Sequence, residues 1–195
     1  MNEIADIQKN NGLRLFAELV TELSSSTKTN DKLQSLVDYF AIAPDGDKVW
    51  VIALFSGRRP RRAVNLKLMR EWCIELAQIS DWLFTECHHT VGDFSETLAL
   101  LLAKTETLQH ENKNLSYYLE KLISIEKEDE TVKKNFILDS WHQMNAEEKF
   151  VFNKLITGAF RIGVSQKTIV NALAKVVDVS PSIIAHRISG NWDPL

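Results

Sequence analysis

Hydrophobic side chains recur every three or four residues along most of the chain, the spacing that places them on one face of an α-helix. Strand-like alternation is scarce, and the one β-branched run, KVWVIALF from Lys48, fits a buried helix as well as a strand. The pattern therefore predicts an all-α fold of about ten or eleven helices. The two clearest apolar faces are Leu13, Phe16, Val20 and Leu23 in a first helix, and Leu33, Leu36, Val37 and Phe40 in a second that begins near Asn30 or Asp31.

Residues suited to begin or end helices stand between these apolar sets. Asp93 with Glu96, and Asn145 with Glu148, have the three-residue spacing of a capping box. The same signals predict a helix from about Asp47 to Ser56 that stops at Gly57, one from Asn65 through about Gln78, one from Ser80 to Gly92, one that begins at Ser165, and one at Ser180 with Pro181 in its first position.

The segment from Thr105 to Thr131 is polar and rich in Glu and Lys. It predicts either a divider between two lobes or one long solvated helix through Tyr117, Leu119, Leu122 and Ile125. We expect a single domain over residues 1–195, with lobes at about 1–104 and 131–195 joined by the polar helical segment 105–130.

With 195 residues, of which 45% are hydrophobic, the chain can bury one substantial core or two small ones. Apolar runs such as Leu98 to Ala103 are far shorter than the ~20 residues that span a bilayer, and the N-terminus is too polar for a signal peptide. We expect a cytoplasmic monomer that does not enter a membrane. Cys73 and Cys87 are expected to be free, buried thiols.

Catalytic and metal-binding patterns are weak. Cys87, His88 and His89 are adjacent, but successive side chains on a helix point about 100° apart and do not converge on one metal. No phosphate loop or nucleophile elbow is present, and the carboxylates of Glu126 to Glu130 form a surface-like run. We expect no metal and no complete active site within the chain.

The net charge of −3 hides an uneven distribution. Six basic residues and no acid lie between Arg58 and Arg70, whereas the excess acid lies between Glu106 and Glu130. Because charge of one sign is concentrated locally, the sequence predicts a surface that binds polyanions.

Two polar loops are candidates for such a surface. SGRRPRRAVN, Ser56 to Asn65, holds four arginines whose planar guanidinium groups suit bidentate contact with phosphate; its alternative role is a solubilising loop with Arg–carboxylate pairs. SSSTKTNDK, Ser24 to Lys32, places Lys28 and Lys32 beside a helix start, where hydroxyl and N–H groups can hold phosphate, but an ordinary capped loop has the same composition.

A third candidate is KLITGAFRIGVSQKT, Lys154 to Thr168. Arg161 projects from the connection, Gly163 allows close backbone approach, and Ser165 caps a helix whose free N–H groups form the positive end of its dipole. Lys167 lies in the first turn. These residues predict an anion site that does not read sequence; a tight turn between helices is the alternative.

ALAKVVDVSPSIIAHRI, Ala172 to Ile188, has the spacing of a helix-turn-helix motif with Ile183 and Ile188 facing inward and Arg187 on the recognition helix. Against this interpretation, Asp178 stands where the motif usually has glycine, and the second helix has few side chains that read base edges. A sequence-specific regulator therefore remains the alternative function. A third hypothesis, an α-helical protein-interaction module, would have no affinity for DNA.

Several of these segments, in order and spacing, resemble the N-terminal DNA-binding domain of bacterial and archaeal ATP-dependent DNA ligases from about Phe16 to Pro194. The most specific are GAFRIGVS and Val91-Gly92-Asp93 with Glu96-Thr97. The full set of segments is TKTNDK, GRRPRR, EWCIELAQISDWLFTECHHTVGDFSET, KLITGAFRIGVSQKTIVNAL and AHRISGNWDP.

The resemblance implies an all-helical domain that lies across the minor groove of nicked double-stranded DNA and holds phosphates on both sides of the break, in repair, replication or recombination. Binding would be independent of sequence and would weaken steeply with salt. The residues expected near the DNA backbone are Lys28, Thr29, Arg58, Arg59, Arg61, Gly92, Arg161, Gly163, Ser165 and Lys167.

DNA ligases of this kind react through a lysine in a Lys-x-Asp-Gly motif on a downstream nucleotidyltransferase domain. Asp45-Gly46 is the single Asp-Gly pair here, and Ala43 stands where that lysine would be. We therefore expect an N-terminal fragment or truncated homologue of a ligase, without the nucleotidyltransferase and OB domains. No cofactor is expected in this chain; ATP and Mg would serve the full-length parent.

Overall fold

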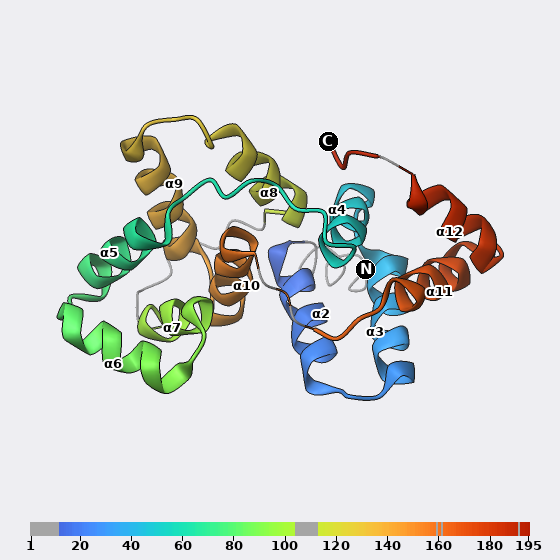
Figure 1. Ribbon diagram of the computed structural model, residues 1–195, viewed down its shortest axis with the longest axis horizontal. Helices are drawn as coiled ribbons and strands as arrows, with labels where there is room; N and C mark the ends of the chain where they lie inside the picture. The colour runs from blue at the N-terminus through green and yellow to red at the C-terminus, as the bar shows by residue number, and fades with distance from the viewer. Residues whose placement is uncertain (1–11, 104–112, 159, 161, 191) are drawn as a thin grey trace, which may run out of the picture. The chain divides into compact units, whose positions relative to one another are not determined.

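The computed structural model describes residues 12–103, 113–158, 160, 162–190 and 192–195, and the helices that they form are shown in Figure 1. Within these residues the chain forms eleven helices and no strand, which confirms the predicted all-α fold. The helices are α2 (Leu13–Ser25), α3 (Thr29–Ile42), α4 (Asp45–Phe55), α5 (Leu66–Ala77), α6 (Asp81–Val91), α7 (Phe94–Leu101), α8 (Leu115–Ser124), α9 (Glu130–Gln143), α10 (Ala146–Thr157), α11 (Gln166–Val177) and α12 (Pro181–Ser189).

Contacts divide the chain into two compact units. The first contains the described residues of 1–59, 114–116 and 160–195, and the second those of 60–113 and 117–159. These units differ from the expected lobes at 1–104 and 131–195, because α11, near the end of the chain, packs along α3, near its beginning. Proximity in sequence therefore does not decide which helices share a core.

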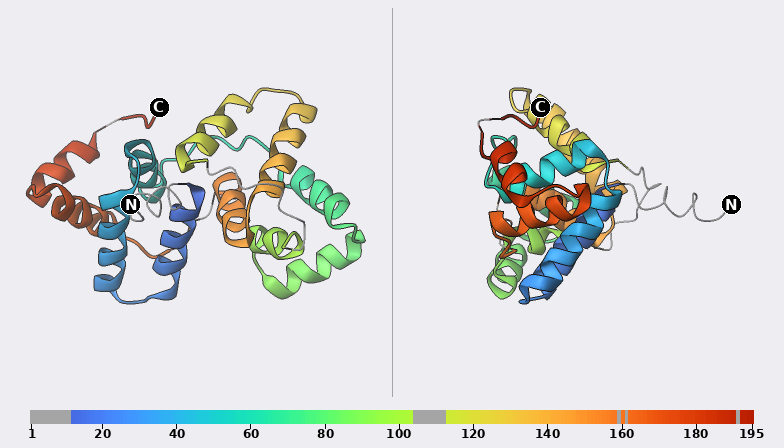
Figure 2. Two further views of the ribbon diagram at one scale, coloured as in Figure 1. Left: turned by 180° about the vertical axis from the view of Figure 1, so that it is seen from behind. Right: turned by 90° about the vertical axis from the view of Figure 1, so that its right-hand side faces the viewer.

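The first unit is built on α2 and α3, which lie side by side as a helical hairpin (Figure 1, Figure 2). The apolar face predicted for α2 is buried, with Phe16 and Leu23 fully inaccessible to solvent. Phe16 also contacts the rings of Phe55 in α4 and of Phe160, at centroid distances of 6.1 and 5.5 Å. This aromatic cluster ties the connection before α11 to α2 and α4.

The second unit is centred on α10, which packs against α7. Its buried face includes polar groups whose hydrogen bonds are satisfied within the protein. The Trp141 indole N–H donates to Asn153 Oδ1 over 2.9 Å, and Asn153 Nδ2 donates to the Ser95 carbonyl over 3.3 Å. Lys149 Nζ donates to the Leu102 carbonyl, and burial lowers the pKa of Lys149.

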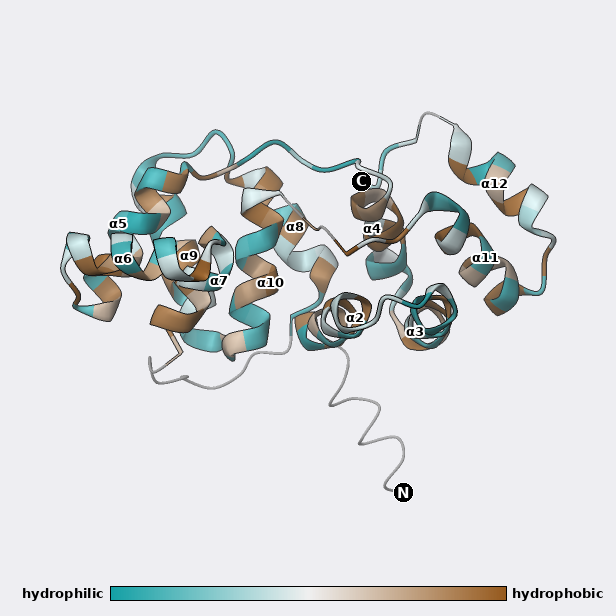
Figure 3. Cartoon of the chain, turned by 60° about the horizontal axis from the view of Figure 1, so that its bottom comes forward, coloured by the Kyte–Doolittle hydropathy of each residue, from teal (hydrophilic) through white to brown (hydrophobic). Residues whose placement is uncertain are grey.

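Most of the residues predicted to begin helices do so in the structure. Asn145 and Glu148 form the complete capping box at the start of α10. Asn65, Asp93 and Ser165 each accept a backbone N–H in the first turn of the following helix. The Ser180 hydroxyl instead bonds that of Ser182, over 3.1 Å. The hydrophobic and hydrophilic sides of the helices are visible in Figure 3.

The polar segment 105–130 is partly a buried helix. Residues 104–112 lie outside the described part of the chain, but α8 buries Leu115, Tyr118, Leu119 and Leu122, so this stretch is not a solvated helix. The Asp47 carboxylate accepts the backbone N–H groups of Leu115 and Ser116, over 3.3 and 2.9 Å. A buried acid from α4 thus caps α8, a contact that local sequence signals did not predict.

The helices α11 and α12 are bent by 120° at their connection. Val170, Ala174 and Ile184 form the buried contact between them, with Ile188 partly buried beside it. The prediction that Ile183 faces inward is wrong, because its side chain is 46% exposed. Ile184 and Ile188, four residues apart, share the inner face of α12, and Ile183 is turned about 100° away from Ile184.

Candidate nucleic-acid interface

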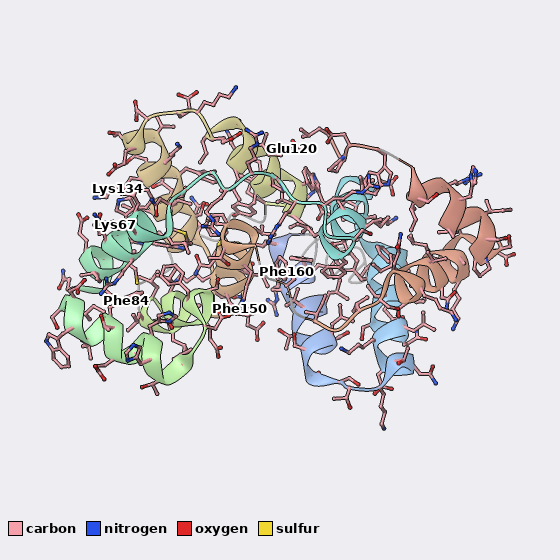
Figure 4. The ribbon with its side chains drawn as sticks, viewed as in Figure 1. Lys67, Phe84, Glu120, Lys134, Phe150 and Phe160 are labelled. Atoms are coloured by element: carbon pink, nitrogen blue, oxygen red, sulfur yellow. The ribbon has the colours of Figure 1, made fainter. Side chains whose placement is uncertain are left out.

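The chain enters α11 through a segment that is anchored at two apolar side chains. Phe160, which is labelled in Figure 4, packs on the rings of Phe16 and Phe55, and Ile162 is buried. Gly163, the next residue, is exposed and has φ of +60°, a left-handed conformation that disfavours other residues. The segment therefore presents its backbone to solvent just before the helix.

At the start of α11, Ser165 accepts the N–H of Thr168 over 3.2 Å. The earlier N–H groups, of Gln166 and Lys167, have no partner within the helix, as at any helix start. The first turn carries no acidic residue, and Lys167 is exposed. Backbone donors, the positive end of the helix dipole and one lysine thus face solvent together, an arrangement suited to phosphate.

The start of α3 has a comparable arrangement. The Ser26 hydroxyl donates to the Asp31 carboxylate over 2.9 Å and accepts the backbone N–H of Lys28 over 3.1 Å. This turn holds the loop in place and leaves the side chains of Lys28 and Thr29 exposed. Asp31 reduces the positive potential at this helix start, so the start of α3 is less suited to an anion than the start of α11.

Lys32 brings the two helix starts together. From the first turn of α3, its Nζ donates to the carbonyl of Ile162 over 2.5 Å and lies 3.4 Å from that of Gly163. The predicted candidates in two distant loops therefore belong to one surface of the first unit. We call this surface, formed by Lys28, Thr29, Lys32, Gly163, Ser165 and Lys167, the α3–α11 site.

Arg58 and Arg59 follow Gly57, whose φ of +81° ends α4. The Arg58 guanidinium donates to the carbonyls of Trp192 and Gly190, over 2.8 and 2.7 Å, and lies over the Trp192 ring at 4.8 Å. Arg58 therefore holds the C-terminal segment of the first unit. Arg59 is exposed and can meet an external anion.

In the second unit, Arg61 is exposed on the segment before α5, and Gly92 is exposed at the end of α6 with φ of +77°. The residue after Gly92, Asp93, forms a close ion pair with Lys154. Burial tends to raise the pKa of Asp93, but the hydrogen bonds from Lys154 and from the Glu96 backbone lower it below its usual value. The turn at Gly92 is thus fixed to α10. The remaining candidate, Arg161, lies outside the described residues.

The described residues contain no group of three His, Cys, Asp or Glu side chains that could hold a metal ion. His88 Nδ1 lies 3.3 Å from Thr97 Oγ1, and its ring contacts Phe94. Cys73 and Cys87 are free thiols, and burial raises the pKa of Cys73 to about 12. In the same part of the chain no single helix is long and apolar enough to cross a membrane; only α11 and α12 taken together pass a test of length and composition.

The described residues thus define an all-helical protein in which exposed cations and backbone donors gather at two neighbouring helix starts. The family model of the DNA ligase N terminus matches residues 13–174, well over half of the chain. The chain therefore belongs to this family, which confirms the predicted family; the AHRISGNWDP segment lies beyond the matched residues. The matched range includes the whole α3–α11 site. A comparison with curated proteins finds no match.

Proposed function

We propose that the chain binds nicked double-stranded DNA through backbone phosphates, independently of base sequence, as the N-terminal clamp of an ATP-dependent DNA ligase. It would do so as a cytoplasmic monomer, in repair, replication or recombination. The observation that carries the proposal is the bridge of Lys32 to Ile162, which joins two helix starts into one surface. Membership of the DNA ligase N-terminus family supports DNA as the polyanion that this surface would bind.

The chemistry of the α3–α11 site favours phosphate over base edges. Its donors are backbone N–H groups at a helix start and the flexible ammonium groups of Lys28 and Lys167. Such donors fix the position of a duplex but carry no sequence information. Gly163 has no side chain to keep a phosphate away from the backbone. Arg59 in the first unit, and Arg61 and Gly92 in the second, are the further contacts that we propose.

Fluorescence anisotropy with nicked, intact and single-stranded probes over a salt series tests this function. We expect no dependence on base sequence and a linear fall of log K with log salt, with a slope of about −0.9 per phosphate contacted. Lys167→Glu should weaken binding to every duplex and reduce the slope by about 1. Lys175→Glu, an exposed change at the other end of α11, is the matched control.

Binding that is insensitive to salt, or equal losses for Lys167→Glu and Lys175→Glu, would contradict the proposal. We propose that sealing itself depends on a Lys-x-Asp-Gly lysine outside these residues, with ATP and Mg as cofactors. This chain, without a Lys-x-Asp-Gly lysine, is not expected to seal nicks by itself.

Sequence-specific regulation remains the second candidate, because the bend of 120° between α11 and α12 is that of a helix-turn-helix. It would require a dimer, a palindromic site and a role for Arg187 in choosing that site. Selection from a random duplex pool tests this: an enriched palindrome that is lost in Arg187→Ala would favour the regulator over the clamp.

A further inference from the structure

One residue, His88, holds both sides of the turn between α6 and α7. Its backbone carbonyl accepts the N–H of Gly92 over 2.8 Å, where α6 ends. Its imidazole reaches α7, where Nδ1 lies 3.3 Å from the hydroxyl oxygen of Thr97. Gly92 has φ of +77° and open space where a Cβ would stand, so a phosphate can approach its backbone. His88 therefore joins the two helices on either side of this proposed contact.

The hydrogen bonds of Thr97 determine which nitrogen of His88 carries the proton. Thr97 Oγ1 donates its single hydrogen to the carbonyl of Asp93 over 2.7 Å, so it can only accept from His88. The neutral imidazole is therefore protonated at Nδ1 and unprotonated at Nε2. A directed chain of hydrogen bonds thus runs from His88 through Thr97 to the backbone of Asp93, the residue after Gly92.

Packing fixes the orientation of the imidazole ring. The ring meets Phe94 edge-on at a centroid distance of 5.8 Å and contacts Phe84 of α6, labelled in Figure 4, at 6.4 Å. Thr97 is 1% exposed, so water does not compete for its hydroxyl. A hydrogen bond in such surroundings is stronger than one at the surface.

The side chain of Asp93 is held separately. Its carboxylate accepts the N–H of Glu96 over 3.0 Å and pairs with Lys154 of α10. Because Lys154 balances its charge, the carboxylate opposes a phosphate at Gly92 less than a free one would. The turn therefore has two anchors, the ion pair to α10 and the bond from His88 to Thr97.

We propose that His88 is a positioning residue for DNA binding, which holds the Gly92 turn in the conformation that receives a phosphate. This inference rests on the proposed function. Held as the Nδ1–H tautomer, His88 acts through Thr97 and the backbone of the turn and does not itself contact the phosphate. Without this bond the turn would have to be ordered when DNA binds, at a cost in affinity.

Nitrogen-15 NMR of the full chain tests the tautomer. At about pH 8 a histidine side chain in water is neutral. We expect His88 Nδ1 to show the chemical shift of a protonated ring nitrogen and Nε2 that of an unprotonated one. Thr97→Val removes the acceptor but keeps the shape of the side chain, so this preference should be lost. A proton on Nε2 in the wild-type chain would overturn the proposal.

Two substitutions of His88 test the donor. Asparagine carries its amide nitrogen on Cγ, as Nδ1 is carried, whereas the amide nitrogen of glutamine is one carbon farther away. We expect His88→Gln to weaken binding of nicked duplex about threefold or more, and to reduce the shift of the Gly92 amide when duplex is added. His88→Asn should retain most of the affinity. His142→Gln, at a partly buried histidine of α9 in the same unit, is the matched control.

Circular dichroism establishes that each variant is folded before its affinity is compared. The proposal is overturned if His88→Gln binds like the wild type, or if His88→Asn loses as much affinity as His88→Gln. Lys167→Glu, in the first unit, reports on the proposed function separately. If Lys167→Glu weakens binding and His88→Gln does not, the role of His88 alone is overturned; a wild-type chain that binds no duplex overturns both.

Discussion

Lys32 and Ile162, 130 residues apart in sequence, are joined by a hydrogen bond from the lysine Nζ to the isoleucine carbonyl. This contact fixes the backbone before α11 against the first turn of α3. Lys32→Met keeps the length of the side chain but removes the donor, so we expect the free energy of unfolding to fall by roughly 1.5–3 kcal/mol, the usual loss for a hydrogen bond to a charged group.

DNA affinity should fall with Lys32→Met as well, because the two helix starts lose their common anchor along with one positive charge. Thermal denaturation and anisotropy measure the two effects. Lys48→Met is the control, because Lys48 is also half-buried in the first unit but pairs with the exposed Asp45. Equal effects of both substitutions would show that the bridge has no special role.

Gly163→Val should weaken DNA binding while the fold survives. Valine is strained at φ of +60°, and its Cβ would lie 3.0 Å from Lys32 Nζ. The strain should cost about 1–2 kcal/mol of stability. Gly190→Val is a suitable control, since Gly190 has φ of −67° and open space around it. Circular dichroism and anisotropy distinguish loss of fold from loss of binding, and undiminished affinity would remove Gly163 from the site.

Asp93 and Lys154 should make the second unit sensitive to acid. The pKa of Asp93 is lower in the folded state than in the unfolded state, where it is about 3.9. The ionised carboxylate therefore stabilises the fold above the unfolded pKa, and this contribution is lost as the pH falls from the unfolded pKa through the folded pKa. Asp93→Asn should destabilise the protein at neutral pH and flatten this part of the stability curve. Denaturant unfolding between about pH 2 and 7 measures it, with the exposed Asp139→Asn as control; an unchanged curve would contradict the assignment.

Arg58→Ala should release the C-terminal segment of the first unit. Hydrogen exchange at the Trp192 indole N–H, which donates to the Ile188 carbonyl over 2.9 Å, measures the release. Arg58→Lys should not restore protection, because an ammonium lacks the planar fork that bonds two carbonyls. DNA affinity should fall less with Arg58→Ala than with Arg59→Ala, since the guanidinium of Arg58 is engaged within the protein. A larger fall in DNA affinity with Arg58→Ala than with Arg59→Ala would contradict this and indicate that Arg58 contacts DNA.

Local rules predicted the helices well, because the features they rest on lie within a few residues of each other. The apolar face of α2 and the capping box at Asn145 are examples. Contacts between distant segments were not predictable from spacing. Asp47 caps α8, and Arg58, expected at a phosphate, is held by Trp192. The sequence identified candidate residues for the α3–α11 site, but only the fold shows that Lys32 joins its two halves.

The first unit contains segments from both ends of the chain, and this arrangement limits the order in which the two units can fold. Its core needs α3 and α11, so it closes only after the residues from 160 onward have been synthesised. Most of the second unit lies between these segments and is complete earlier. During translation the second unit can therefore form first, while the apolar faces of α2 and α3 stay uncovered until α11 has been synthesised. A chain that ends before α11 would leave that surface uncovered and prone to aggregate.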